Sequence, residues 1–487
     1  MTSGLSPLDT MAMHMVAGAS PKVRELFQRL AERQSGSADW QRRCYEASPG
    51  SPSTLAFEAP VLPLCVERAD GGRIWDVDGN EYIDCHMGYT AGVLGHNPPA
   101  VAKVVNELMP RGLGAGHFFP EQVELAELVK EMVPGADRVS MFHTGGEAIA
   151  AAVRMARATR GKMRVAKFEG CYHGSRDIGL HNTWMILSGM PPGDPVNAIT
   201  PSVATGGLPT RGDDEFMVLA FNDPSALERI RAEADSLACI VCDPTPVFAS
   251  PWLDGARQFV RELALLASEL DVPLILDEIV CGFRIAKGGA RQWAEIEPAM
   301  SCFGKITSGL GVPMSMVVGD SRYVDAARTA GMFRDYGGNK VWAASTMSCN
   351  FVAVISALAQ MRYLDDNHDD VLARLDRNHA RLAEQIAEIG QRRSVPICIQ
   401  GNPRLQMQLS FSDHADVEPS YRGMMQDTSP AEFMKLIAFT FYLRENGVYM
   451  KAIPSMNLSA GHTDADIDGL AGAIDASIGQ MTEDGVL

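Results

Sequence analysis

The segment RVSMFHTGGEAIAAAVRMARATRGKMRVAKFEG, residues 138–170, contains the pattern that decides the fold. Two short apolar runs, RVSMFHT and RVAKFEG, flank the segment EAIAAAVRMARATRG, whose apolar residues recur at the helical period. Short runs that are hydrophobic nearly throughout are typical of strands in a mostly parallel sheet that is covered on both faces. The segment therefore predicts a strand, a helix and a second strand of an α/β domain.

The same alternation continues through the middle of the chain. A second amphipathic helix is predicted over residues 251–271, and four more short apolar runs are strand candidates. These runs are FMVLAFND at 216–223, ACIVCDPT at 238–245, PLILDEIV at 273–280 and SMVVGD at 315–320. The middle of the chain is therefore predicted to be one α/β domain.

The two ends of the chain show other patterns. Ser20 and Pro21 begin a predicted amphipathic helix, SPGSPST at 48–54 is a predicted linker, and alternation from about Val61 predicts a small β-meander. After about residue 350 the pattern predicts helices at 351–367, 369–393, 430–446 and 463–480, with a strand in RLQMQLSFSD, 404–413. We predict an N-terminal segment at 1–85, a large α/β domain at 86–350 and an α+β domain at 351–487.

Composition and charge predict a folded chain of two or three domains without nucleic-acid or membrane partners. The 487 residues are 46% hydrophobic and 21% charged, close to the averages for folded chains. A net charge of −17 repels a phosphate backbone. The start lacks a signal-peptide pattern, and no stretch approaches the length of an apolar membrane span. We therefore expect a cytoplasmic protein.

The cysteines and histidines predict neither a disulfide framework nor a metal site. Ten cysteines are spread from Cys44 to Cys398 without dense spacing, which favours reduced thiols. Cys239 and Cys242 form a CxxC, but they lie in an apolar run and no second CxxC follows. Because free cysteine is often buried, these two are predicted to be ordinary core residues. There is also no HExxH motif.

The loop HTGGEA, residues 143–148, is the first of four candidate loops, and open α/β sheets place function in loops of this kind at the ends of strands. Its two glycines precede a helix, and bare amides at a helix N-terminus attract phosphate. A plain tight turn explains the pattern equally well. The third glycine of a dinucleotide fingerprint is missing and no P-loop occurs, so nucleotide binding is a minor hypothesis.

The other three loops add an aromatic ring, carboxylates and a lysine. FEGCYHG at 168–174 contains Tyr172, whose ring could stack on a flat cofactor or simply pack. Asp277 in LILDEIVCGF ends an apolar strand, where a carboxylate is costly unless it is paired. Lys305 in CFGKITSG is either a surface lysine or a desolvated nucleophile. Together with the phosphate-attracting glycines, these are the parts that hold pyridoxal phosphate.

With these motifs, the chain resembles the class III, fold type I aminotransferases that depend on pyridoxal phosphate, and among them the glutamate-1-semialdehyde aminomutase branch. The resemblance runs from about Gly72 to the end. It is carried by GGRIWDVDGNEYID, HTGGEA, KFEGCYHG, LILDEIVCGFR, FGKITSGLGVPMS, STMSCN and ENGVYMKAIPSMNLSAGHTDADID. It implies an α/β fold with a large, mostly parallel seven-stranded sheet domain and a smaller α+β domain built from both ends of the chain.

The resemblance also implies roles for single residues. Lys305 would form the Schiff base and then shuttle a proton, and Asp277 would pair with the pyridine nitrogen. The other implied cofactor contacts are Gly145 and Gly146 at the phosphate, Tyr172 and Ile279 on opposite ring faces, His173 beside Tyr172, and Thr346 from the partner subunit. Because Thr346 would serve the neighbouring site, the resemblance implies a homodimer with shared active sites.

The chain departs from the family pattern at several positions. Gly146 replaces a Thr or Ser, Asp243 replaces a Glu, and Phe351 replaces a Pro. Leu55 stands where the mutase branch has an Arg that binds the substrate carboxylate. An apolar substrate is therefore expected, or one whose carboxylate meets another cation, such as Arg422.

We expect an aminotransferase that moves an amino group between an amine or non-standard amino acid and a keto acid. An aminomutase acting on one substrate is the alternative. A non-catalytic relative is disfavoured because Lys305 and Asp277 are retained. A nucleotide-binding dehydrogenase is the remaining rival.

Overall fold

The chain forms two compact units in a computed structural model. The structure describes residues 20–48, 64–183, 195, 197–203, 207–208, 215–246, 252–328, 340–411, 422, 430–450 and 455–487. The terminal unit comprises Met1–Pro98, Leu372–Ala415 and Gln426–Leu487, and the central unit comprises Pro99–Val371 and Asp416–Met425. The three-segment division at 1–85, 86–350 and 351–487 stays a prediction.

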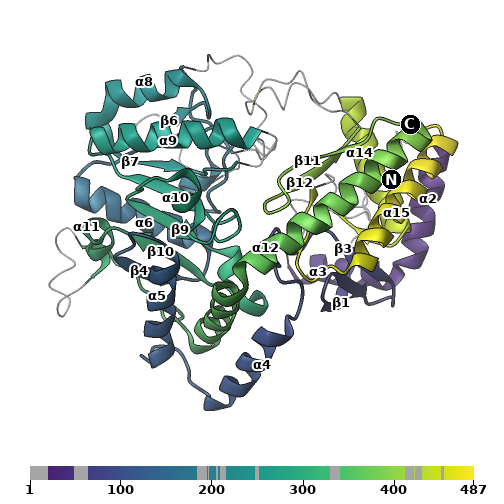
Figure 1. Cartoon of the computed structure of the whole chain (residues 1–487), viewed down its shortest axis with the longest axis horizontal. Coiled ribbons are helices and arrows are strands. Elements are labelled where there is room, and N and C mark those ends of the chain that lie inside the picture. The colour runs from purple at the N-terminus through teal and green to yellow at the C-terminus, as the bar shows by residue number, and fades with distance from the viewer. Residues whose placement is uncertain are drawn as a thin grey trace. The chain divides into compact units, whose positions relative to one another are not determined.

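A seven-stranded sheet forms the middle of the central unit, in the order β4-β10-β9-β8-β7-β5-β6 (Figure 1). Its strands are β4 (Arg138–Phe142), β5 (Arg164–Phe168), β6 (Phe216–Leu219), β7 (Leu237–Cys242), β8 (Leu274–Glu278), β9 (Met300–Phe303) and β10 (Ser315–Gly319). Only β10 runs against its neighbours β4 and β9. The mostly parallel α/β sheet expected from the sequence is therefore confirmed.

The predicted apolar runs of the central unit all form strands. Strand β9 was not predicted, because the run MSCF that precedes the Lys305 loop is short and contains no β-branched residue. The reversed direction of β10 was not predicted either. The direction of a strand has no local signal in the sequence, because it is decided by pairing with the neighbouring strands.

Helix α6 (Gly145–Arg160) begins where a capping box satisfies its first amides. The hydroxyl of Thr144 accepts a hydrogen bond from the Glu147 amide at 3.3 Å, and the Glu147 carboxylate accepts one from the Thr144 amide at 3.4 Å. The helix ends at Gly161, which adopts the left-handed conformation that suits glycine. Helix α6 therefore starts at Gly145, two residues before Glu147, where the sequence predicted its start.

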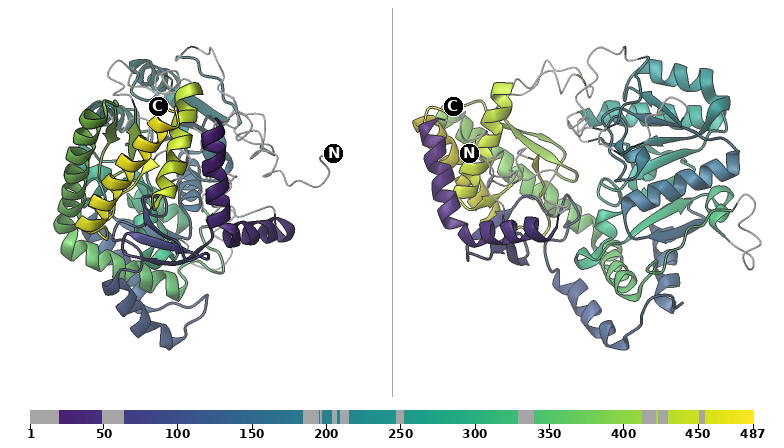
Figure 2. Two further views of the ribbon diagram at one scale, coloured as in Figure 1. Left: turned by 90° about the vertical axis from the view of Figure 1, so that its right-hand side faces the viewer. Right: turned by 180° about the vertical axis from the view of Figure 1, so that it is seen from behind.

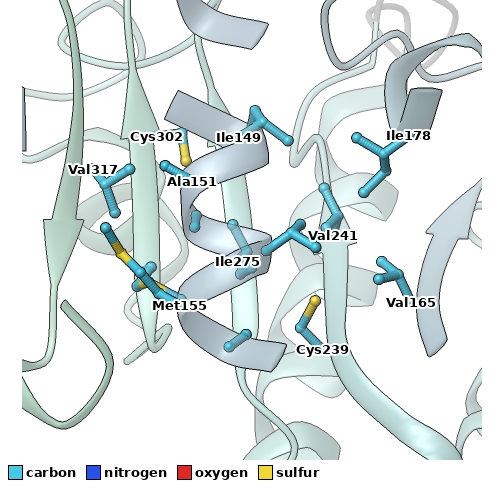
Figure 3. Packing of buried hydrophobic residues seen from close by; sticks show 14 of the residues in the cluster. Ile149, Ala151, Met155, Val165, Ile178, Cys239, Val241, Ile275, Cys302 and Val317 are labelled. Carbon is cyan, nitrogen blue, oxygen red and sulfur yellow. The ribbon is translucent and has the colours of Figure 1, made fainter. Parts of the chain in front are cut away.

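Helices cover both faces of the central sheet (Figures 1 and 2). On one face, apolar side chains of α6 pack over β5, β7, β8, β9 and β10 (Figure 3). Val165 of β5 belongs to this cluster. Phe168 is an odd number of residues away and points to the other face, where its ring lies 5.6 Å from that of Phe259 in α9 (Leu253–Glu269). The sheet is therefore buried on both sides.

The terminal unit is built from both ends of the chain. Its four-stranded sheet contains β1 (Val66–Asp70), β2 (Arg73–Asp76), β3 (Glu81–Asp84) and β13 (Val448–Tyr449), and a three-stranded sheet contains β11 (Cys398–Gly401), β12 (Met407–Ser410) and β14 (Ser455–Met456). Its helices include α2 (Pro21–Arg33), α3 (Ser35–Ala47), α14 (Pro430–Glu445) and α15 (Asp464–Glu483). The expected smaller α+β domain is confirmed, although α3 was not predicted.

Two local signals of this part of the chain are borne out. The hydroxyl of Ser20 accepts a hydrogen bond from the Val23 amide and so caps α2. Helix α12 (Phe351–Arg393) has a non-helical residue at Asn367, where the sequence predicted a break between two helices. The linker predicted at 48–54 lies almost wholly outside the described residues.

Within the described ranges, none of the helices combines the length and the apolar character that crossing a membrane requires.

Candidate active site

The predicted functional loops meet at one edge of the central sheet. Strands β5, β7, β8 and β9 pair in parallel and therefore point the same way. Strand β10 runs antiparallel to both β9 and β4, so β4 points the same way as well. Their carboxyl ends therefore lie along a single edge. The residues found there are the Gly145 turn, the Tyr172–His173 loop, Asp243, Asp277 and Lys305.

Close backbone approaches bring these loops together. A Cβ added to Gly145 would lie 2.8 Å from Cδ1 of Ile279, and one added to Gly304 would lie at the same distance from that atom. The Ile279 side chain therefore lies between the helix α6 turn and the residue that precedes Lys305. A Cβ on Gly174 would lie 2.3 Å from the Gly146 Cα, and Gly174 has a φ of +92°. Glycine is therefore needed at position 174 for these loops to touch.

Asp277 is held by a histidine from the neighbouring loop. His173 Nδ1 and Asp277 Oδ2 lie 2.6 Å apart, and the Ile279 amide donates to Asp277 Oδ1 at 3.2 Å. Burial lowers the pKa of His173, although Asp277 acts in the opposite direction. A neutral His173 therefore donates its Nδ1 proton to the carboxylate. This pairing meets the requirement that a carboxylate at the end of an apolar strand find a partner.

Lys305 lies directly after β9 in a strained backbone conformation. Its φ of 51° is in the left-handed region, which costs energy for a residue with a side chain. Burial lowers the pKa of the Lys305 ammonium to about 8, and the carboxylates of Asp277 and Asp243 oppose that shift. Near neutral pH the amine can therefore lose and regain its proton readily.

Two more carboxylates at this edge have shifted pKa values. Burial and the charge of Asp277 raise the pKa of Asp243 to about 7. Burial also raises the pKa of Glu278 to about 7, and this carboxylate accepts a hydrogen bond from the Ala290 amide at 2.5 Å. From the sequence, Asp243 was recognised only as a departure from the family pattern, and no role was predicted for Glu278. The signal for both was an acidic residue directly after an apolar run.

Tyr172 and Thr346 remain accessible in this chain. The Tyr172 side chain is 41% exposed, so one ring face is available for stacking. Thr346 is exposed in the turn that precedes α12. The structure therefore does not bury either side chain within its own unit.

Of the two residues considered for substrate recognition, the structure describes Arg422 but not Leu55. Arg422 makes two hydrogen bonds to Glu169, at 2.8 Å from Nε and 3.2 Å from Nη2. Glu169 begins the loop that carries Tyr172, so Arg422 lies against that loop. Leu55 is outside the described residues.

The donor set at this edge fits pyridoxal 5′-phosphate. Lys305 would supply the amine for the aldehyde, and Asp277 the anion for the ring nitrogen. Ile279 would form one wall, while the amides of Gly145 and Gly146 at the start of α6 would meet the phosphate. Asp277 at the end of β8 and Lys305 just after β9 lie on neighbouring parallel strands, and their placement at one sheet edge supports this fit. The site thus has the parts of a fold type I pyridoxal-phosphate enzyme.

Comparison with known proteins identifies the family. Residues 54–450 match the profile of Aminotransferase class-III, and the chain belongs to this family. It is 30% identical over 443 residues to a glutamate-1-semialdehyde 2,1-aminomutase of Methanosphaera stadtmanae, covering 89% of this chain and 96% of that protein. It is 29% identical over 434 residues to the enzyme of that name from Chloroflexus aggregans, covering 86% and 91%.

Solved structures support the same conclusion. An omega-transaminase from Sphaerobacter thermophilus superimposes with a TM-score of 0.78 and 26% identity, covering 92% of this chain and 98% of that chain. A beta-phenylalanine aminotransferase from Variovorax paradoxus gives a TM-score of 0.76 at 22% identity, covering 95% and 98%, which shows a shared fold. The protein is therefore an enzyme that depends on pyridoxal phosphate.

The lowered pKa of Lys305 predicts how cofactor capture depends on pH. Only the neutral amine attacks an aldehyde, so covalent capture of pyridoxal phosphate by the apoprotein should accelerate as pH rises through about 8 and then level off. A solvated lysine would continue to gain rate up to about pH 10. Stopped-flow absorbance gives the rate, and borohydride reduction followed by peptide mapping gives the site. Lys305→Ala should capture no cofactor. A tag on Lys340, or an inflection near pH 10, would contradict the assignment.

Substitution of Asp277 should lower turnover without destabilising the fold. Asp277→Asn keeps the shape and an oxygen for His173 but removes the charge, and a charge-assisted hydrogen bond contributes about 1.5–3 kcal/mol. Turnover should therefore fall about ten- to hundredfold while the unfolding midpoint changes little. Asp243→Asn is the matched control, because a carboxyl with a pKa of about 7 is already partly neutral. Its effect on turnover should be smaller. Wild-type rates in Asp277→Asn would refute the role.

Proposed function

We propose that this enzyme is an aminotransferase that moves an amino group between an amine or non-standard amino acid and a keto acid. The observation that supports it best is the meeting of Lys305, the His173–Asp277 pair and the Gly145–Ile279 contact at one sheet edge. These side chains come from three different strand ends. The family of the chain is consistent with this chemistry.

The roles of the side chains follow from their surroundings. When bound, pyridoxal phosphate supplies an aldehyde and an electron-withdrawing ring. Lys305 holds the cofactor and can move a proton at Nζ, because its pKa of about 8 is close to neutral pH. His173 keeps Asp277 oriented through the Nδ1 hydrogen bond. Tyr172 and Ile279 restrict the ring from either face.

A glutamate-1-semialdehyde type of aminomutase is the second candidate. The names of the two curated relatives favour it, although identity is only 29–30%. Both candidates use the same site residues and differ in whether one substrate undergoes both amino transfers. Only the substrate therefore distinguishes the aminomutase from the aminotransferase.

The setting of Arg422 bears on the substrate. Glu169 already neutralises its guanidinium through two hydrogen bonds, so a substrate carboxylate would have to compete with that carboxylate. Arg422 is thus not a ready anion site in this conformation. This favours an amine or a substrate with an apolar group at that position.

We also propose a homodimer in which Thr346 completes the partner's phosphate site. Gln122 Nε2 donates to the carbonyl oxygens of His117 and Cys349, so the segments next to Phe118 and Met347 lie together. Phe118 is 82% exposed and Met347 is 53% exposed. Large apolar side chains exposed near one another favour a protein interface, and two-fold dimers are the commonest assembly.

The state of the thiols supports a reducing compartment. All ten cysteines are free, and those in the strands and loops of the central sheet are buried. Because disulfides persist mainly in oxidising compartments, a chain with this many free thiols fits the cytoplasm. We propose that location.

A panel of amines and amino acids tests the proposed reaction. Each compound is mixed with the holoenzyme without a keto acid, and absorbance reports conversion of the bound aldehyde to the aminated cofactor. An aminotransferase should be converted by one class of donor and restored by a keto acid. Glutamate-1-semialdehyde is tested alone in parallel. Its efficient conversion to 5-aminolevulinate would establish the mutase instead, and no conversion by any donor would refute both candidates.

Subunit complementation tests the shared site. Thr346→Ala should bind the cofactor more weakly, because a hydrogen bond to a charged group contributes about 1.5–3 kcal/mol. Lys305→Ala should be inactive. Where Thr346→Ala is inactive, exchange of its subunits with those of Lys305→Ala should restore some activity, because the mixed dimer has one site with both intact residues. A monomer by light scattering, or no recovery despite proven exchange, would contradict the proposal.

A further inference from the structure

Lys167 is a buried lysine near the carboxyl end of β5, the strand next to the edge strand β6 of the central sheet. It lies in β5, within the run RVAKF, and its side chain is 0% exposed. Burial of an ammonium group is costly unless hydrogen bonds replace its water. Burial lowers the pKa of Lys167 to about 8, so the group still carries its charge at pH 7. A residue kept at this cost requires an explanation.

The hydrogen bonds of Lys167 explain how an ammonium group is accommodated at this buried position. Val165, two residues earlier, faces the α6 side of the sheet, and so does Lys167. Its Nζ donates to the carbonyl oxygens of Ile178, at 2.9 Å, and of His181, and lies 3.5 Å from that of Cys171. An ammonium group has three donors, and all three are directed at backbone carbonyls.

These carbonyls belong to a single closed loop. The Gly170 amide donates to the Asn182 carbonyl at 2.7 Å, which pairs the two ends of the segment. Cys171 precedes Tyr172 and His173, whereas Ile178 and His181 follow them. Lys167 therefore reaches from the rigid sheet into the loop and binds the backbone on both sides of the two residues.

We propose that Lys167 is a positioning residue, whose buried ammonium fixes the loop that presents Tyr172 and His173 to the cofactor. The inference rests on the proposed function, because it assumes that these two side chains face the cofactor. His173 then holds Asp277 at 2.6 Å, so the effect of Lys167 extends to the carboxylate that meets the ring nitrogen.

The charge of Lys167 adds to this role. The positive charge opposes protonation of His173, whose pKa is lowered mainly by burial and further by Lys167. The other charged group acting on both residues is Asp277. An uncharged side chain of similar length would lose both the three hydrogen bonds and this influence.

The test compares Lys167→Met with Val165→Ala. Methionine has a similar length without charge or donors, whereas Val165→Ala weakens the same strand and face by removing buried methyl groups in the α6 cluster. Two readouts are used: hydrogen exchange of residues 169–183 in the apoprotein, and the dissociation constant and visible circular dichroism of bound pyridoxal phosphate. Lys167→Gln, which keeps an uncharged donor, should be intermediate.

We expect Lys167→Met to speed exchange in 169–183, to weaken cofactor binding by about tenfold or more and to change the dichroism, since small misplacements in a site are costly. Val165→Ala should lower the unfolding midpoint and leave these readouts near wild type. Equal effects in both variants, or wild-type values in Lys167→Met, would overturn the inference. So would failure of both Lys167 variants to fold where Val165→Ala does, because Lys167 would then serve the whole fold. Absence of cofactor binding in the wild type would instead refute the proposed function.

Discussion

The direction of the strands in the central sheet is the constraint on which the rest of the structure depends. Because six of the seven strands, all but β10, end at the same edge, loops that are far apart in the chain deliver their side chains to one place. Gly145, Ile279 and Gly304 come so close there that a single added Cβ would collide. The antiparallel β10 preserves this arrangement, since it returns β4 to the direction of β9.

Electrostatics at this edge are set by burial and then balanced by neighbours. Burial raises the pKa values of Asp243 and Glu278 and lowers those of Lys305 and Lys167. Each shift favours the neutral form of its group. Asp277 has a buried histidine, His173, as a direct hydrogen-bond partner. A site that brings acids and amines toward neutrality near pH 7 is well suited to proton transfer.

Much of the fold could be predicted from the sequence, and the exceptions have physical causes. The apolar runs around Val165 and Ile275 predicted strands because two-sided burial favours hydrophobic residues at nearly every position. The Thr144–Glu147 capping box explains why α6 starts two residues earlier than predicted. Strand β9 and helix α3 were missed because Met300–Phe303 is short and Ser35–Ala47 has few apolar residues.

The sequence by itself determined which residues we propose for the chemistry: Lys305 in its small-residue loop, Asp277 at the end of a strand, and the paired glycines at 145–146. Tertiary structure alone decided their partners. The bond between His173 and Asp277 and the carbonyls around Lys167 depend on strand order and on the path of the loop. The local periodicity of the sequence predicts whether a residue is buried. It does not predict which residues surround it, because partners that are distant in the chain are brought together only by the folded sheet.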